Sequence, residues 1–125
     1  MTDQILIIDD DTTIGTVLKE ELEEIGYIAF YADGADTGLE ILFSRKIDLV
    51  LLDLKMPGKD GFYVLNKLNE SNIKSKVIVL TAYADVKSAI ESARMGASDF
   101  ISKPYDLDEL IITIRKVLQK EEDEN

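Results

Sequence analysis

Short apolar runs alternate along this chain with stretches whose apolar residues recur at helical spacing, and this alternation limits the fold more than any other feature. The clearest runs are Ile5–Ile8, Leu49–Leu52 and Val77–Leu80, and the weaker ones are Ile28–Tyr31 and Asp99–Ile101. A strand that is apolar on both faces must be covered on both faces, which is typical of a parallel sheet between two layers of helices. The chain is therefore predicted to be an α/β protein.

Five helices are predicted between and after these strands, each with one apolar stripe. The stripes are Ile14, Val17, Leu18, Leu22 and Ile25; Leu39, Leu42 and Phe43; Phe62, Leu65 and Leu68; Val86, Ala89, Ile90 and Ala93; and Leu107, Leu110, Ile111, Ile114, Val117 and Leu118. We expect Gly26 and Gly96 to end the first and fourth helices and Asp60 to cap the third. Right-handed crossovers then predict a doubly wound (βα)5, flavodoxin-like three-layer sandwich, with a parallel five-stranded sheet in the order 2-1-3-4-5.

The composition limits the chemistry that this fold can carry. The 125 residues suit one domain, expected over residues 1–120, with residues 121–125 (EEDEN) as an acidic tail or the start of a linker. The absence of cysteine and histidine excludes disulfides, thiol nucleophiles and the common zinc sites, and is consistent with a cytoplasmic protein. The net charge of −11 disfavours direct binding to nucleic acid. No apolar run is long enough to span a membrane, and the N-terminus is unlike a signal peptide.

Polar residues follow four of the five predicted strands. They are Asp9, Asp10 and Asp11 after the first, Asp53 after the third, Thr81 and Ala82 after the fourth, and Lys103 and Pro104 after the fifth. Ligands bind beyond the carboxyl ends of such strands, and strands 1 and 3 are neighbours in the predicted order. Asp9 and Asp10 are therefore expected to face Asp53. Converging carboxylates repel one another, and a hard divalent cation such as Mg²⁺ would offset that repulsion, with Lys103 as a further positive charge.

Each of these residues also has a purely structural interpretation. Asp11 is expected to cap the helix that follows it, and the whole Asp9–Asp11 run favours a helix N-terminus. Asp53 alone is common as the first residue of a turn, and Lys103-Pro104 is common in loops. The combination of all four strand ends favours a site that holds a metal and a phosphoryl group.

Four segments resemble, in order and spacing, the receiver domains of bacterial two-component response regulators. They are ILIIDDD (5–11), DLVLLDLKMPGKDG (48–61), VIVLTAYAD (77–85) and GASDFISKPYDLDEL (96–110), and together they cover nearly the whole chain. Within the family, the last two segments are most similar to receivers of the nitrogen-regulation class and of sporulation phosphorelays. The resemblance implies a phosphorylation-dependent signalling switch that is not an enzyme in the ordinary sense, since it catalyses only its own phosphorylation and dephosphorylation.

The resemblance also implies a role for each residue of the site. Asp53 would be the phospho-acceptor, and Mg²⁺, with Mn²⁺ as the alternative, would be held by Asp9, Asp10, Asp53 and the backbone carbonyl of Lys55. The phosphoryl group would be bound by Thr81, Lys103 and the backbone of Ala82. Thr81 and Phe100 would form the switch pair. A cis peptide is expected between Lys103 and Pro104, and Tyr83 would flank the site.

Partners are implied by the same resemblance. Because the chain has no histidine, the phosphoryl group must come from a sensor histidine kinase, a histidine phosphotransfer protein or a small donor such as acetyl phosphate. The output would be a downstream protein, an effector domain or a homodimer, reached through the fourth helix, fifth strand and fifth helix. We hypothesise that Ile112 and Tyr105 belong to that partner surface. We also hypothesise that Tyr83 shields the acyl phosphate from water and slows autodephosphorylation.

Three other classes of protein fit this sequence less well. A phosphohydrolase of the haloacid-dehalogenase type needs a second Asp two residues after the nucleophile, where this chain has Lys55. A flavodoxin-like electron carrier needs a phosphate loop after the first strand, where Asp9–Asp11 would repel the flavin phosphate. A receiver that is never phosphorylated would not need the full acceptor set. The kinase, the pathway, the output partner, the oligomeric state, the lifetime of the phosphorylated state and any further domain stay open.

Overall fold

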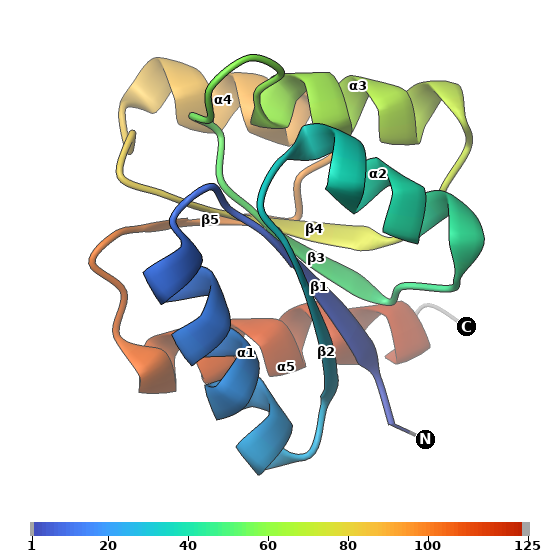
Figure 1. Cartoon of the computed structure of the whole chain (residues 1–125), viewed down its shortest axis with the longest axis vertical. Helices are drawn as coiled ribbons and strands as arrows, with labels where there is room; N and C mark the ends of the chain where they lie inside the picture. Colours follow the sequence, from blue (N-terminus) through green and yellow to red (C-terminus); the bar gives the residue numbers. More distant parts are fainter. Residues whose placement is uncertain (1, 124–125) are drawn as a thin grey trace.

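Five parallel strands form the central sheet, in the predicted order β2-β1-β3-β4-β5 (Figure 1). The structure is a computed structural model that describes residues 2–123. The strands are β1 (Gln4–Ile8), β2 (Ile28–Ala32), β3 (Leu49–Leu52), β4 (Lys76–Thr81) and β5 (Asp99–Ser102). In the register, Ile8 pairs with Leu52, and Leu52 pairs with Val79. The carboxyl ends of β1, β3 and β4 therefore meet at one edge of the sheet.

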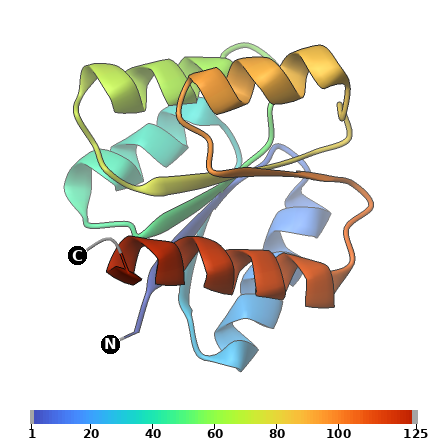
Figure 2. The ribbon, with the colours of Figure 1, turned by 180° about the vertical axis from the view of Figure 1, so that it is seen from behind.

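Five helices cover the sheet in two layers. They are α1 (Thr12–Ile25), α2 (Ala35–Ser44), α3 (Gly61–Glu70), α4 (Val86–Arg94) and α5 (Leu107–Asp123). Helices α1 and α5 lie on one face, and α2, α3 and α4 lie on the other (Figures 1 and 2). In β1, Ile5 and Ile7 join the core under α1 and α5, while Leu6 and Ile8 join the core on the opposite face. The same division in β3, with Leu49 and Leu51 on one face and Val50 and Leu52 on the other, explains why that strand is apolar at every position.

The helix ends that the sequence predicts are confirmed. Asp11 caps α1 by accepting hydrogen bonds from the amides of Thr13 and Ile14. Asp60 caps α3 in the same way, through the amide of Tyr63. Gly26 ends α1 in the left-handed region, with φ of 117°. Because a side chain is strained in that conformation, glycine is the natural residue to stop the helix there.

Two of the predicted stripes are only partly buried. In α1, Leu18 and Leu22 are buried, whereas Val17 and Ile25 are exposed. In α2, Leu39 and Leu42 are buried but Phe43 is exposed. The physical reason is that glycines bring both helices close to the sheet, with Gly15 against Tyr31 and Gly38 against Ile8. The part of each helix that contacts the sheet is therefore narrower than the apolar stripe, and the apolar residues at the sides of the stripe remain exposed to solvent.

The two C-terminal helices differ more strongly. In α5 the residues Leu110, Ile111, Ile114, Val117 and Leu118 are buried, as the stripe predicts, and Ile112 is exposed. In α4 the helix itself is confirmed, but Val86 and Ile90 of its stripe are exposed and Ser92 is the buried residue. Helix α5 continues to Asp123, past the expected domain boundary at residue 120, and residues 124–125 of the expected tail lie outside the described residues. Within residues 2–123, no helix combines the length and hydropathy needed to cross a bilayer.

Candidate functional site at the carboxyl edge of the sheet

Backbone hydrogen bonds continue past the ends of the strands and fix the residues that follow them. The amide of Asp9 donates to the carbonyl of Ala32 at 3.1 Å, and the amide of Asp53 donates to the carbonyl of Ile8 at 3.0 Å. The amide of Lys103 donates to the carbonyl of Thr81 at 2.9 Å. Each side chain of the site therefore starts from a backbone position that is set by the sheet.

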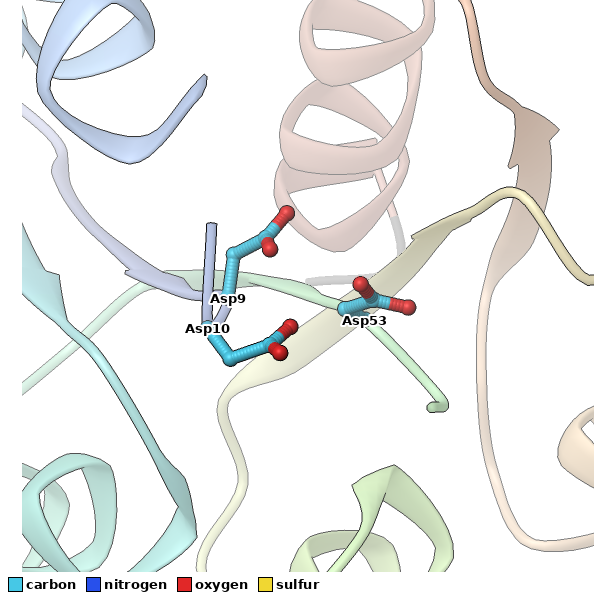
Figure 3. A group of neighbouring side chains, drawn as sticks. All are labelled: Asp9, Asp10 and Asp53. Atoms are coloured by element: carbon cyan, nitrogen blue, oxygen red, sulfur yellow. The ribbon is translucent and has the colours of Figure 1, made fainter. Parts of the chain in front are cut away.

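Three carboxylates meet where β1 and β3 end, as Figure 3 shows. One oxygen each from Asp9, Asp10 and Asp53 can be chosen so that all lie within 4.8 Å of one another. Asp9 and Asp53 are buried, at 2% and 7% exposure, and Asp10 is exposed. Burial raises the pKa of Asp9, and the hydrogen bond from Lys103 only partly offsets that rise. An all-oxygen donor set with an excess of negative charge fits a hard divalent cation such as Mg²⁺.

Lys103 brings one positive charge into this acidic group. Its Nζ donates to Oδ2 of Asp9 at 2.6 Å and to Oδ2 of Asp53 at 3.1 Å. Burial opposes the charged form, but the two carboxylates outweigh burial and raise the pKa of Lys103. The lysine is therefore held as a cation between the two acids. The Lys103–Pro104 peptide bond is cis.

The second oxygen of Asp53 is held from the other side. Oδ1 of Asp53 accepts a hydrogen bond from the Thr81 hydroxyl at 2.7 Å and one from the amide of Lys55 at 3.1 Å. The same Thr81 oxygen accepts a hydrogen bond from the amide of Tyr83 at 3.2 Å. Thr81 is fully buried, and its hydroxyl is already turned toward Asp53 in this structure. Both oxygens of Asp53 thus have a fixed direction.

The mouth of the site is lined by residues that follow β3 and β4. Nζ of Lys55 lies 4.8 Å from the centroid of the Tyr83 ring, which is a cation–π geometry. Tyr83 is half exposed, and Ala82 beside it is exposed. Phe100 on β5 pairs with Val79 in the register and packs, half-buried, against the core on the α2 and α3 side. Phe100 therefore contributes to the core on that face of the sheet.

Comparison with known proteins gives this arrangement a family. The model of the response regulator receiver domain matches residues 5–115. The chain belongs to the response regulator receiver domain family. A receiver domain is a signalling domain controlled by phosphorylation, so the chain is a phosphorylation-dependent signalling switch of a two-component or phosphorelay system.

Relatives of this receiver include both short and long proteins. Sporulation initiation phosphotransferase F of Bacillus subtilis is 36% identical over 118 residues, which cover 94% of this chain and 95% of the relative. Regulatory protein AtoC of Escherichia coli is 35% identical over 116 residues, which cover 93% of this chain but 25% of AtoC. The chain thus spans about a quarter of AtoC, and about half of the transcriptional activator IrlR of Burkholderia pseudomallei. The resemblance to sporulation-phosphorelay receivers is confirmed by the first of these relatives.

Solved structures confirm the fold of the receiver. A CheY-like receiver domain protein from Methanospirillum hungatei superposes with a TM-score of 0.94 at 33% identity, with both chains covered completely. The receiver domain of NtrX from Brucella abortus superposes with a TM-score of 0.85 at 29% identity, over 92% of this chain and 98% of that domain. The flavodoxin-like order of strands is therefore that of other receivers.

The sequence pattern does not indicate that Tyr31 contacts this site. The hydroxyl of Tyr31 on β2 donates to the backbone carbonyl of Asp9 at 2.7 Å. Burial, and then the negative charge of Asp9, raise the pKa of Tyr31, so its hydroxyl keeps its proton. Tyr31 lies in an apolar run and was predicted only as a strand residue. Its contact depends on the packing of α1, which periodicity does not reveal.

Proposed function

We propose that Asp53 is the residue of this receiver that accepts the phosphoryl group. The observation that supports this role is the buried carboxylate of Asp53, with one oxygen bonded to Thr81 and the other to Lys103. Because both oxygens are held by hydrogen bonds, the carboxylate has one fixed orientation from which to attack a phosphorus atom in line with the bond that breaks. Residues 1–120 would form the receiver unit.

In the proposed reaction, an oxygen of Asp53 attacks the phosphorus atom while the bond from phosphorus to the donor breaks. The donor leaves with the bonding electron pair, and the product is an acyl phosphate on Asp53. Lys103 would donate hydrogen bonds to the phosphoryl oxygens, together with the Thr81 hydroxyl and the amide of Ala82. Mg²⁺, or Mn²⁺ in its place, would be held by Asp9, Asp10, Asp53 and the carbonyl of Lys55 and would offset the negative charge on the phosphoryl oxygens.

The phosphohistidine donor lies outside these 125 residues, because they contain no histidine. We propose a sensor histidine kinase or a histidine phosphotransfer protein of the cytoplasm as the physiological donor. Acetyl phosphate would serve as the small donor in vitro. Whether the output is a separate protein, an attached effector domain or a second copy of the receiver depends on the full-length protein.

We propose that the output surface comprises α4, β5 and α5. A phosphoryl group adds acceptor oxygens beside Thr81, which would retain the hydroxyl at the site and bias the position of Phe100 and α4. Ile112, exposed on α5, and Tyr105 would lie on this surface. We expect Ile112→Glu to weaken dimerisation or target binding while changing the free energy of unfolding by less than about 0.5 kcal/mol. Unchanged association with and without phosphate would remove Ile112 from the surface.

The test of the acceptor is the intact mass of the protein after incubation with acetyl phosphate, in Mg²⁺ and in EDTA. We expect one phosphoryl adduct on the wild type in Mg²⁺, and none in EDTA or in Asp53→Asn. Asp108→Asn removes an exposed carboxylate of α5 outside the site and is the matched control, which should still be phosphorylated. An adduct that persists in Asp53→Asn would place the acceptor on another residue.

A further inference from the structure

Both backbone polar groups of Asp9 are bonded to the edge strand β2. The amide donates to the carbonyl of Ala32 at 3.1 Å, which continues the hydrogen-bond ladder of the sheet. The carbonyl accepts from the hydroxyl of Tyr31 at 2.7 Å, which no ladder requires. A tyrosine side chain from β2 thus replaces the backbone partner that the Asp9 carbonyl loses where the strand ends.

The carbonyl of Asp9 belongs to the planar peptide unit that joins Asp9 to Asp10. Holding that carbonyl fixes the plane, and the plane sets where the Asp10 Cα lies and limits the directions open to its side chain. Asp9 has further restraints, because its oxygens accept from Lys103 and from the amide of Asp11. Asp10 is exposed, and among the residues whose side chains the structure describes, none forms a hydrogen bond with its carboxylate. Within the described part of the chain, the backbone is therefore the restraint on where the Asp10 carboxylate can point.

Space for the Tyr31 ring comes from a glycine inside α1. A Cβ atom added to Gly15 would lie 2.0 Å from Cε1 and 2.6 Å from Cζ of Tyr31. Glycine is unfavourable in the interior of a helix, so this position trades helix stability for room. The ring, the first turns of α1 and the Asp9–Asp10 peptide are packed together as one unit.

We propose that Tyr31 is a positioning residue that aims the Asp10 carboxylate at the metal, and that Gly15 is the residue that lets the tyrosine reach its place. The proposal rests on the proposed function, since it assigns Asp10 to the metal site. Tyr31 touches neither the metal ligand atoms nor the phosphoryl group and acts only through the peptide that it holds.

The test compares Tyr31→Phe with Ser75→Ala. Each variant deletes one hydroxyl that donates to a backbone carbonyl. Ser75, however, donates to the carbonyl of Ile47 near the amino ends of β3 and β4, away from the site. We expect Tyr31→Phe to raise the dissociation constant for Mg²⁺ about tenfold by calorimetry, and Ser75→Ala to leave it unchanged. Phosphorylation by acetyl phosphate should need about tenfold more Mg²⁺ in Tyr31→Phe, yet reach the wild-type rate at saturation. In Mg²⁺-free solution the carbonyl ¹³C resonance of Asp9 should shift in Tyr31→Phe only.

Gly15→Ala provides a second variant with the phenol intact. Alanine favours the helix, but the added Cβ must displace the Tyr31 ring, so Mg²⁺ affinity should fall here as well. Dissociation constants within twofold of the wild type in both Tyr31→Phe and Gly15→Ala would overturn the proposal. A wild type that binds no Mg²⁺ would overturn the proposed metal site, and the role of Tyr31 with it.

Discussion

Helices α4 and α5 lie on opposite faces of the sheet (Figures 1 and 2), and they differ in how many of their apolar side chains are buried. In α5, Ile114 is fully buried and the residues one turn before and after it are buried too. In α4, Val86 is 76% exposed and Ile90 is 48% exposed, while Ser92 is the buried residue. Because little apolar area fixes α4, a small change at the site can shift it at low cost. We therefore expect α5 to stay fixed and α4 to move when the site is phosphorylated.

The largest expected effect comes from the same substitution made in both helices. Ile114→Ala removes a fully buried side chain and should reduce the free energy of unfolding by about 2–5 kcal/mol. Ile90→Ala removes a half-exposed one and should change it by less than about 1 kcal/mol. Urea unfolding of the two variants measures the difference. Equal losses would mean that α4 is anchored as firmly as α5.

The next effect concerns Mg²⁺, which should act differently on the two helices. At a concentration a hundredfold above its dissociation constant, Mg²⁺ should add about 2.7 kcal/mol to global stability. Amides of α5 that exchange by global unfolding should gain this protection, whereas amides of α4 that exchange by local opening should not. Asp10→Asn should lose most of the gain, and Asp108→Asn should keep it. Equal stabilisation of Asp10→Asn and the wild type would point to binding outside the site.

A smaller effect tests the loop that leads from the site into α4. The Tyr83 ring lies under Lys55 at the mouth, where it can restrict water. We expect Tyr83→Ala to raise the rate of autodephosphorylation about tenfold, a barrier change of about 1.4 kcal/mol. Tyr83→Phe, which keeps the ring, should stay close to the wild type. The decay of the phosphorylated mass gives the rates, and an identical decay in Tyr83→Ala would refute the shielding role.

The smallest effect concerns the start of α5. Tyr105 donates to Glu21 of α1 at 3.0 Å, and burial, then this hydrogen bond, raise the pKa of Tyr105 to about 12. Because the folded pKa exceeds the unfolded value of 10.0, the contribution is complete below about pH 10 and is lost as the pH rises through about 12.

Tyr105→Phe should therefore be less stable than the wild type by about 0.5–1 kcal/mol at pH 7. The difference between the two proteins should close between pH 10 and about 12. Tyr27→Phe is the control, since Tyr27 packs on the same core and its hydroxyl makes no hydrogen bond within the described part of the chain. A difference that persists unchanged above pH 12 would show that ionisation of the Tyr105 hydroxyl does not control its contribution to stability.

Strand order and strand ends could be predicted from the sequence because they follow from local patterns. Continuous apolar runs such as Leu49–Leu52 imply burial on both faces, and parallel strands bring the residues that follow them to one edge. Asp9, Asp53, Thr81 and Lys103 therefore lie together as expected.

Helix burial and the Tyr31 contact could not be predicted in the same way. Periodicity identifies the apolar side of α4, but the helix buries Ser92, whose hydroxyl donates to the carbonyl of Ala89 at 3.1 Å. Tyr31 reaches Asp9 only because Gly15 lets β2 and α1 approach. The burial of Ser92 and the hydrogen bond of Tyr31 both depend on how closely two elements pack. The apolar pattern of one element gives no information about that distance.

Amide hydrogen exchange of the wild type and Asp53→Asn, with and without acetyl phosphate in Mg²⁺, tests the central claim most directly. In the monomeric receiver, we expect phosphorylation to change exchange in residues 82–94, covering α4 and the loop before it, and to leave residues 110–118 of α5 unchanged. Asp53→Asn should show no change in either helix. Equal changes in α4 and α5, or a change in α4 that also occurs in Asp53→Asn, would contradict the central claim.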